Sequence, residues 1–126
     1  MKAENIGIYL DHAVAHILEV ENEEITAKNI KSEFTHEEKE LSIRKNENLM
    51  HNKEQHLQAK YYKQIIEQAL DFKNILLFGP TTAKSELWNL IKDDLRFKDS
   101  KIELKQADKM TENQQLLFVK EYFNKT

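Results

Sequence analysis

A run of four apolar residues at positions 75–78 marks the centre of the hydrophobic pattern in this chain. Lys73 and Asn74 precede the run, and Gly79 and Pro80 follow it. A short apolar run between polar and turn-forming residues is typical of a strand that is buried on both faces of a sheet. The pattern therefore predicts a central strand around which the other elements pack.

The residues after this run predict a tight turn and then a helix. Gly79 can adopt backbone angles that are closed to other residues, and Pro80 cannot continue a central strand. Thr81 or Thr82 can cap a helix that begins at Ala83. The predicted buried face of this helix consists of Leu87, Leu90, Ile91 and Leu95, with Trp88 on its flank.

Alternating, β-rich segments predict four further strands. Residues 6–10 and 13–20 read as a hairpin around a turn at 11–13, and residues 25–34 read as a third antiparallel strand. Residues 101–107 alternate as a half-buried strand. The predicted inward-facing residues of the third and last strands are Ile25, Ala27, Ile30, Ile102 and Leu104.

Helical periodicity predicts two more helices. Apolar residues recur at a spacing of four over residues 53–72, which indicates one long helix. A last helix is expected to begin near Thr111, because Thr111 and Gln114 have the spacing of a capping box. The residues expected to pack it down are Leu117, Val119, Tyr122 and Phe123.

Between residues 35 and 52 the periodicity fails. Apolar positions are scattered there and charges are frequent, which predicts a mobile loop. Long loops of this kind in a small domain are commonly functional or disordered.

The order of these elements is β-β-β, loop, α-β-α-β-α. It predicts an α/β fold with a mixed sheet of about five strands and three helices, in which an antiparallel hairpin region is extended by parallel strands. This is the outline of a ribonuclease H-like architecture. We expect the 126 residues to form a single domain, which is long enough to bury a substantial core.

Composition and charge then restrict the function. The chain has no cysteine, which excludes disulfides and thiolate chemistry. The N-terminal residues lack the apolar run of a signal peptide and no stretch approaches a membrane span, so a cytoplasmic location is expected. The net charge of −3 gives no support for nucleic-acid binding, but residues 42–63 carry five basic residues against two acidic ones.

Two motifs suggest cofactor or metal sites without completing them. Gly79, Ala83, Lys84 and Ser85 resemble a phosphate-binding loop, but the spacing is one residue short and the second glycine is replaced, so a capped helix start with an exposed lysine is expected. The histidine pairs at 12 and 16 and at 51 and 56 lack a third ligand at a suitable spacing. No cofactor and no metal are therefore predicted.

A two-metal nuclease needs several carboxylates that converge near the end of the central strand. Asp11 could supply the first, and Glu54 or Glu67 could supply the helical one. Gly79 and Pro80 stand where a further carboxylate would be needed. We therefore expect Asp11 to cap amides of its own turn.

Two stretches carry a resemblance to a known family. They are IYLDHAVAHIL at residues 8–18 and ILLFGPTTAKSEL at residues 75–87. With the element order, they resemble the central domain of archaeal and eukaryotic class I release factors and Pelota, and more closely the small bacterial proteins related to that domain.

The resemblance implies a role in translation. In the release factors, a Gly-Gly-Gln motif in the loop before the long helix promotes hydrolysis of peptidyl-tRNA. The corresponding segment here, residues 35–52, contains no glycine, so no enzymatic activity is expected.

The resemblance and the basic segment together suggest contact with ribosomal RNA or tRNA, with ribosomal proteins as further expected partners. In this hypothesis the loop occupies a ribosomal functional site, as in stress, hibernation or rescue, and its basic residues contact phosphates. The candidate RNA-binding residues are Arg44, Lys45, His51, Lys53, His56 and Lys60. The alternatives are an adaptor that binds protein through a helix face, and a degenerate ribonuclease H-like nuclease. Neither a membrane nor a small-molecule substrate is expected.

Overall fold

Five strands form one mixed sheet in the computed structural model, which describes residues 3–21, 24–32 and 47–124. The strands are β1 (Ala3–Leu10), β2 (Val14–Glu21), β3 (Glu24–Lys31), β4 (Phe72–Gly79) and β5 (Lys101–Gln106). Their order across the sheet is β3-β2-β1-β4-β5. β2 pairs antiparallel with β1 and β3, whereas β4 pairs parallel with β1 and β5. The predicted α/β class and ribonuclease H-like topology are therefore confirmed.

The central position of β4 follows from its apolar run. Residues 75–78 are each at most 2% exposed. Ile75 pairs with Ile6 and Leu77 pairs with Ile8, while the intervening pairs belong to the opposite face of the sheet. The prediction of a strand buried on both faces is confirmed.

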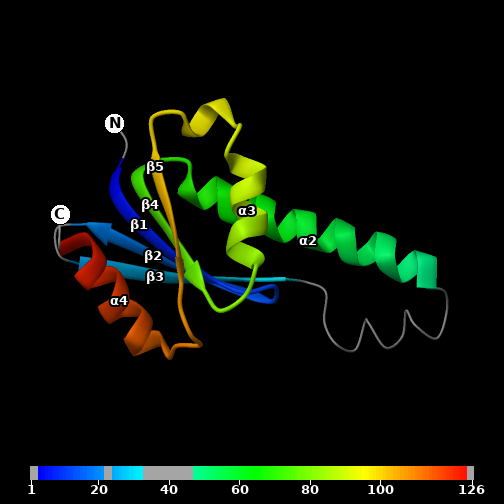
Figure 1. Cartoon of the computed structure of the whole chain (residues 1–126), viewed down its shortest axis with the longest axis horizontal. Helices are drawn as coiled ribbons and strands as arrows, with labels where there is room; N and C mark the ends of the chain where they lie inside the picture. The colour runs from blue at the N-terminus through cyan, green and yellow to red at the C-terminus, as the bar shows by residue number, and fades with distance from the viewer. Residues whose placement is uncertain (1–2, 22–23, 33–46, 125–126) are drawn as a thin grey trace.

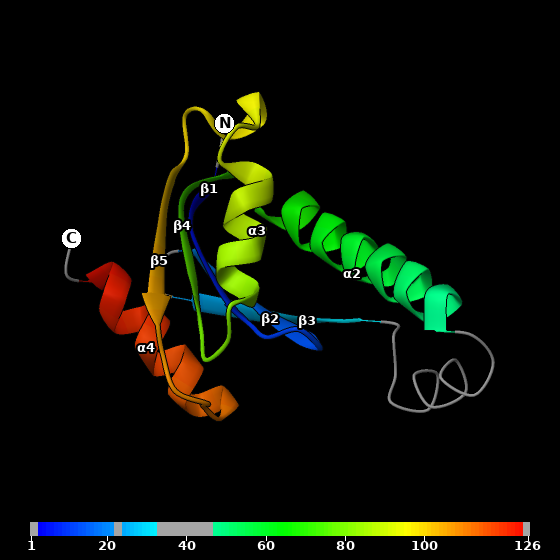
Figure 2. The same ribbon diagram turned by 45° about the vertical axis from the view of Figure 1, so that its right-hand side comes forward.

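Helices cover both faces of the sheet (Figures 1 and 2). α2 (Glu47–Ala69) and α3 (Ala83–Ile91) lie on one face, where Tyr61 and Leu87 join the larger core cluster. α4 (Glu112–Asn124) lies on the other face, where Val119 packs with Leu76 and Phe78. A short 3₁₀ helix, η1 (Leu95–Phe97), follows α3. None of the helices in the described ranges is long and apolar enough to cross a lipid bilayer.

The long helix begins earlier than its apolar stripe. α2 starts at Glu47 and ends at Ala69, and β4 already begins at Phe72. Residues 47–52, which the failed periodicity assigns to a loop, are therefore helical, while residues 33–46 lie outside the described part of the chain. Figures 1 and 2 show the first turns of α2 extending beyond the edge of the sheet. Glu, Leu, Met and Lys, which all have high helix propensity, occur in these turns.

Three leucines predicted to be buried are exposed. α3 ends at Ile91, so Leu95 lies beyond it and is 81% exposed, and Leu90 is 55% exposed. In α4, Leu117 is 60% exposed because the buried face runs through Gln115 and Val119. Ala27 of β3, predicted to face inward, is also exposed.

The capping box of α4 forms as predicted. The backbone N–H of Thr111 donates to Oε1 of Gln114 at 2.9 Å, and the backbone N–H of Gln114 donates to Oγ1 of Thr111 at 3.3 Å. These reciprocal bonds satisfy two backbone donors at the helix start.

Candidate functional site

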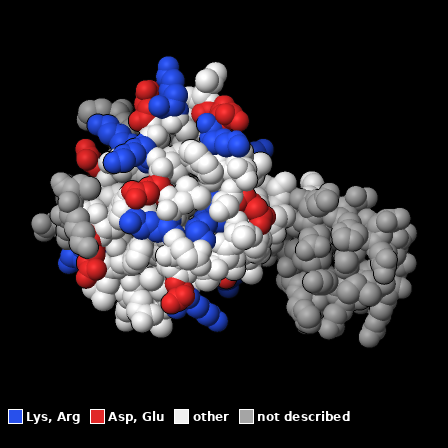
Figure 3. All heavy atoms as spheres, in the orientation of Figure 1, with Lys and Arg blue, Asp and Glu red and all other residues white. Residues whose placement is uncertain are grey.

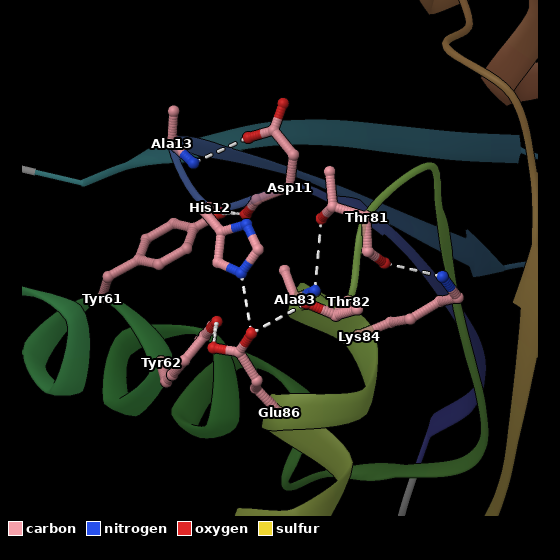
Figure 4. A network of polar contacts seen from close by, with 10 residues as sticks. All are labelled: Asp11, His12, Ala13, Tyr61, Tyr62, Thr81, Thr82, Ala83, Lys84 and Glu86. Atoms are coloured by element: carbon pink, nitrogen blue, oxygen red, sulfur yellow. Dashed lines mark hydrogen bonds and ion pairs between the residues drawn. The ribbon is translucent and has the colours of Figure 1, made fainter.

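The carboxyl ends of β1 and β4 lie at one edge of the sheet because the two strands are parallel. The turn after β1 carries Asp11 and His12, and the turn after β4 leads into α3. The edge outside the carboxyl ends of parallel strands, where connections leave in opposite directions, is the usual position of a site in α/β folds. Figure 4 shows side chains from these turns, from α2 and from α3 converging there.

Asp11 organises the turn between β1 and β2. Its Oδ1 accepts hydrogen bonds from the backbone N–H groups of Ala13, at 2.7 Å, and Val14, at 2.8 Å. The predicted turn-capping role of Asp11 is confirmed. Within residues 3–21, 24–32 and 47–124, no three His, Asp or Glu side chains are grouped so that they could hold a metal ion.

Glu86 of α3 connects three elements through its carboxylate (Figure 4). Its Oε2 lies 2.8 Å from Nε2 of His12 in the β1–β2 turn and accepts a bond from Oγ1 of Thr82 at 3.0 Å. Its Oε1 accepts a bond from the hydroxyl of Tyr62 on α2 at 2.9 Å. Partial burial alone would raise the pKa of Glu86, but these hydrogen bonds outweigh it and lower the pKa below its ordinary value. The carboxylate is therefore held ionised as an anchor between the turn, α2 and α3.

The neighbouring Tyr61 fixes α2 to the same turn. Its hydroxyl donates to the backbone carbonyl of Asp11 at 2.8 Å. Burial raises the pKa of both Tyr61 and Tyr62 far above the ordinary value, so both hydroxyls stay protonated and act as donors. Both tyrosines are buried, so they are not available on the surface of α2 to bind another protein.

Lys84 is buried, contrary to the expectation of an exposed lysine, and is only 7% exposed. Its Nζ donates to the carbonyls of Gly79, at 3.1 Å, and Thr81, at 2.7 Å, and to Oε1 of Gln106, at 2.8 Å. Burial lowers its pKa. The sequence pattern cannot show this, because the lysine folds back over the short Gly-Pro-Thr turn instead of extending into solvent. Its three donors are used within the fold, so it does not act as the lysine of a phosphate-binding loop.

Four of the six candidate RNA-binding residues lie on α2. Arg44 and Lys45 lie outside the described residues. His51 and Lys53 belong to the first turns of α2, and their side chains are not described. His56 and Lys60 are both exposed and are one turn apart. An exposed lysine outside the candidate set, Lys63, continues the same side of the helix.

In the view of Figure 3, the described residues over the body of the molecule show no concentration of positive charge. Lys and Arg side chains alternate there with Asp and Glu over the face that carries β5, α3 and α4. Among the described residues on this face, a surface of mixed sign offers little attraction for a phosphate backbone.

The Glu86 anchor escaped prediction from the sequence. Glu86 and His12 are 74 residues apart, and only the parallel pairing of β1 with β4 brings their turns together. A single Glu in the first turn of a helix is common, because its negative charge interacts favourably with the positive end of the helix dipole. The one local signal is Thr82, which stands four residues before Glu86 and bonds to it.

Removal of the Glu86 charge is expected to reduce the loss of stability in acid. Because the pKa of Glu86 is lower in the folded chain than its ordinary value of 4.5, its contribution is present above that value and is lost as the pH falls below it. Thermal melts at pH 7 and pH 3.5 should show a smaller acid-induced decrease in Tm for Glu86→Gln than for the wild type. Glu121→Gln, on the exposed side of α4, is the control and should follow the wild-type profile. Equal acid responses of wild type and Glu86→Gln would contradict the anchor.

Comparison with known proteins supports the fold. No family model and no curated protein sequence matches the chain. Among solved structures, the chain is similar to Pelota from Archaeoglobus fulgidus, with a TM-score of 0.60 and 9% identity over 96% of this chain. It is also similar to the archaeal translation termination factor aRF1, with a TM-score of 0.62 and 16% identity over 91% of this chain. The matches cover 32% of each of those proteins, so this chain spans about a third of their length. The resemblance to the central domain of release factors and Pelota is thus confirmed at the level of the fold.

Proposed function

We propose that this chain is a cytoplasmic, ribosome-associated protein that acts without catalysis, by contacting RNA and occupying a functional site of the ribosome. The similarity of nearly the whole chain to one third of Pelota and of a translation termination factor carries the proposal. A fold alone does not fix a function, so the site must supply the remaining support.

The support from the site is the position of α2 and the two exposed lysines, Lys60 and Lys63, in its described part. Its first turns extend beyond the sheet, where they can reach a partner that the body does not touch (Figure 2). His56, Lys60 and Lys63 are exposed along this helix, downstream of Arg44 and Lys45 in the sequence. Exposed lysines on a helix can neutralise phosphates without reading a base sequence.

The Glu86 anchor gives this arm a fixed direction. Tyr62 and Tyr61 lie in the half of α2 that packs on the core, and each bonds to a different part of the strand-end edge. A helix held at its inner end in this way presents its outer end in one orientation. In this proposal the network positions the RNA-contacting arm and takes no part in a reaction.

Reversal of charge on α2 is expected to weaken association with ribosomes. In the double variant Lys60→Glu, Lys63→Glu, the bound fraction in a sucrose gradient at low salt should fall at least about tenfold, because two favourable phosphate contacts become repulsive. The dependence of binding on salt should also become shallower, with the slope of log K against log salt reduced by about 1.5. The measurement is co-sedimentation of purified protein with 70S ribosomes across a series of salt concentrations.

The matched control is Lys109→Glu, Lys120→Glu, which makes the same change of charge at exposed positions before and within α4. It should bind as the wild type does. Equal losses in both double variants would indicate a general charge effect and remove the support for the α2 contact.

The adaptor alternative predicts a different result in the same assay. Binding through an apolar helix face would depend little on salt and would survive nuclease treatment of the sample. If the wild type stays at the top of the gradient in extracts of both growing and starved cells, the ribosome proposal is wrong. Growth and starvation samples also separate a constitutive role from one in stress, hibernation or rescue.

A further inference from the structure

Gln115 of α4 is a polar residue buried in the apolar layer between α4 and the sheet. It is 2% exposed, and the buried residues of this layer are Tyr9, Leu18, Leu76, Phe78, Ala107 and Val119. Among the described residues, no group donates a hydrogen bond to its Oε1 atom. A buried acceptor without a donor is costly, and native structures commonly supply the missing partner as an ordered water molecule.

The other atom of the Gln115 amide fixes the orientation of the group. Its Nε2 donates to the backbone carbonyl of Met110 at 3.1 Å. A flipped amide would place Oε1 against that carbonyl, where two acceptors would face each other. Rotation of the amide therefore cannot provide Oε1 with a donor.

Tyr9 of β1 has the complementary requirement. It is 4% exposed, and its hydroxyl oxygen accepts a hydrogen bond from the backbone N–H of Met110 at 3.1 Å. The hydroxyl also has a proton to donate, for which the described part of the chain offers no bonded acceptor. A donor on Tyr9 and an acceptor on Gln115 are thus both unused, and both side chains bond to the backbone of Met110.

The packing of α4 on β1 brings these two side chains together. Met110 precedes α4 and bonds to Tyr9, whereas a Cβ at Gly7 would lie 2.5 Å from Cγ2 of Val119, so α4 runs back along β1. Gln115 comes four helix residues before Val119, which is a rise of about 6 Å. Tyr9 comes two strand residues after Gly7, which is also about 6 Å. Gln115 therefore lies over Tyr9.

We propose that Tyr9 and Gln115 form a binding site for one buried water molecule, which accepts from the Tyr9 hydroxyl and donates to Oε1 of Gln115. Water fits because it accepts and donates at once, and buried waters typically make about three hydrogen bonds. A charged ligand does not fit, because none of the buried apolar residues of this layer can balance a charge. The water links β1 to α4 as a fixed part of the fold. This inference is independent of the proposed function.

Oxygen-17 magnetic relaxation dispersion tests the site in solution, because it counts water molecules that stay inside a protein while it tumbles. Gln115→Met keeps the side-chain length but removes the acceptor, so its signal should be smaller than that of the wild type by one water molecule. Tyr9→Phe removes the hydroxyl and should show the same loss. Gln64→Met makes the matched change at an exposed position of α2 and should keep the wild-type signal. Waters elsewhere in the chain contribute equally to all four proteins and cancel in the difference.

A high-resolution crystal structure of the wild type locates the water directly. It should show one oxygen within about 3 Å of both the Tyr9 hydroxyl and Oε1 of Gln115. This measurement needs no variant, so it decides the question even if Gln115→Met does not fold. Equal dispersion signals from the wild type and a folded Gln115→Met would overturn the proposal. A crystal structure in which a protein group donates directly to Oε1 of Gln115 would also overturn it.

Discussion

Replacement of Gly79 by alanine is expected to lower the free energy of unfolding by about 3 kcal/mol. Gly79 has a φ of 155°, which residues with a side chain rarely adopt. An added Cβ would lie 2.3 Å from the backbone carbonyl oxygen of Leu10. Leu10 ends a strand that is paired on both sides, so the backbone cannot move away without breaking the sheet. Urea denaturation followed by circular dichroism measures the change.

Gly7→Ala separates this backbone effect from simple crowding. A Cβ at Gly7 would meet Cγ2 of Val119 at 2.5 Å, which is a side-chain contact that α4 can relieve by a small shift. We expect a loss of about 1–2 kcal/mol for this overpacking. A smaller loss for Gly79→Ala than for Gly7→Ala would show that the turn after β4 is not constrained as described.

Replacement of Lys84 by methionine is expected to destabilise the chain by about 2 kcal/mol. Methionine keeps most of the side-chain volume but removes the three donors to Gly79, Thr81 and Gln106. The Gly79 carbonyl keeps one bond, from the backbone N–H of Ala107 at 3.1 Å, so the main losses fall on the Thr81 carbonyl and Gln106. The lost bonds are partly offset, because a charge no longer has to be buried. Denaturant titration at pH 7 gives the measurement.

Lys63→Met is the matched control, since it makes the same chemical change at an exposed position of α2. It should alter stability by no more than about 0.5 kcal/mol. If Lys84→Met were as stable as the wild type, the cost of burying the ammonium group would equal the stabilisation from its hydrogen bonds. Lys84 would then make no net contribution to the stability of the turn.

The order of elements could be predicted from the sequence because each one carries a local signal. The apolar run at 75–78, between polar and turn-forming residues, is typical of a strand with cover on both sides, and Thr111 with Gln114 has the spacing of a local helix cap. Asp11 belongs to the same class, because its partners lie two and three residues away. Such features depend on neighbours in the chain, and the sequence lists those neighbours directly.

The features that could not be predicted depend on residues far away in the sequence, or on where a helix ends and which of its sides faces the core. The first turns of α2 extend beyond the edge of the sheet, and the sequence carries no periodic apolar pattern there. The role of Glu86 depends on His12 and Tyr62, which the sheet and α2 bring to it. Leu95 and Leu117 are apolar residues of a kind common in cores, but both are exposed. Their residue type does not show where a helix ends or which of its faces packs on the sheet. For the candidate site, the sequence could place His56 and Lys60 on a helix, but not the network that orients that helix.

The pairing of β1 with β4 has a consequence for folding while the chain is being synthesised. β1, β2 and β3 follow one another directly, so this part of the sheet can form once these three strands have been synthesised. The other edge of β1 must wait for β4, which follows only after all of α2. Until then an open strand edge and the apolar side chains of Ile6 and Ile8 face solvent. The growing chain is for that interval more prone to aggregate than the finished protein, and the delay is set by the rate of synthesis and not by the stability of the fold.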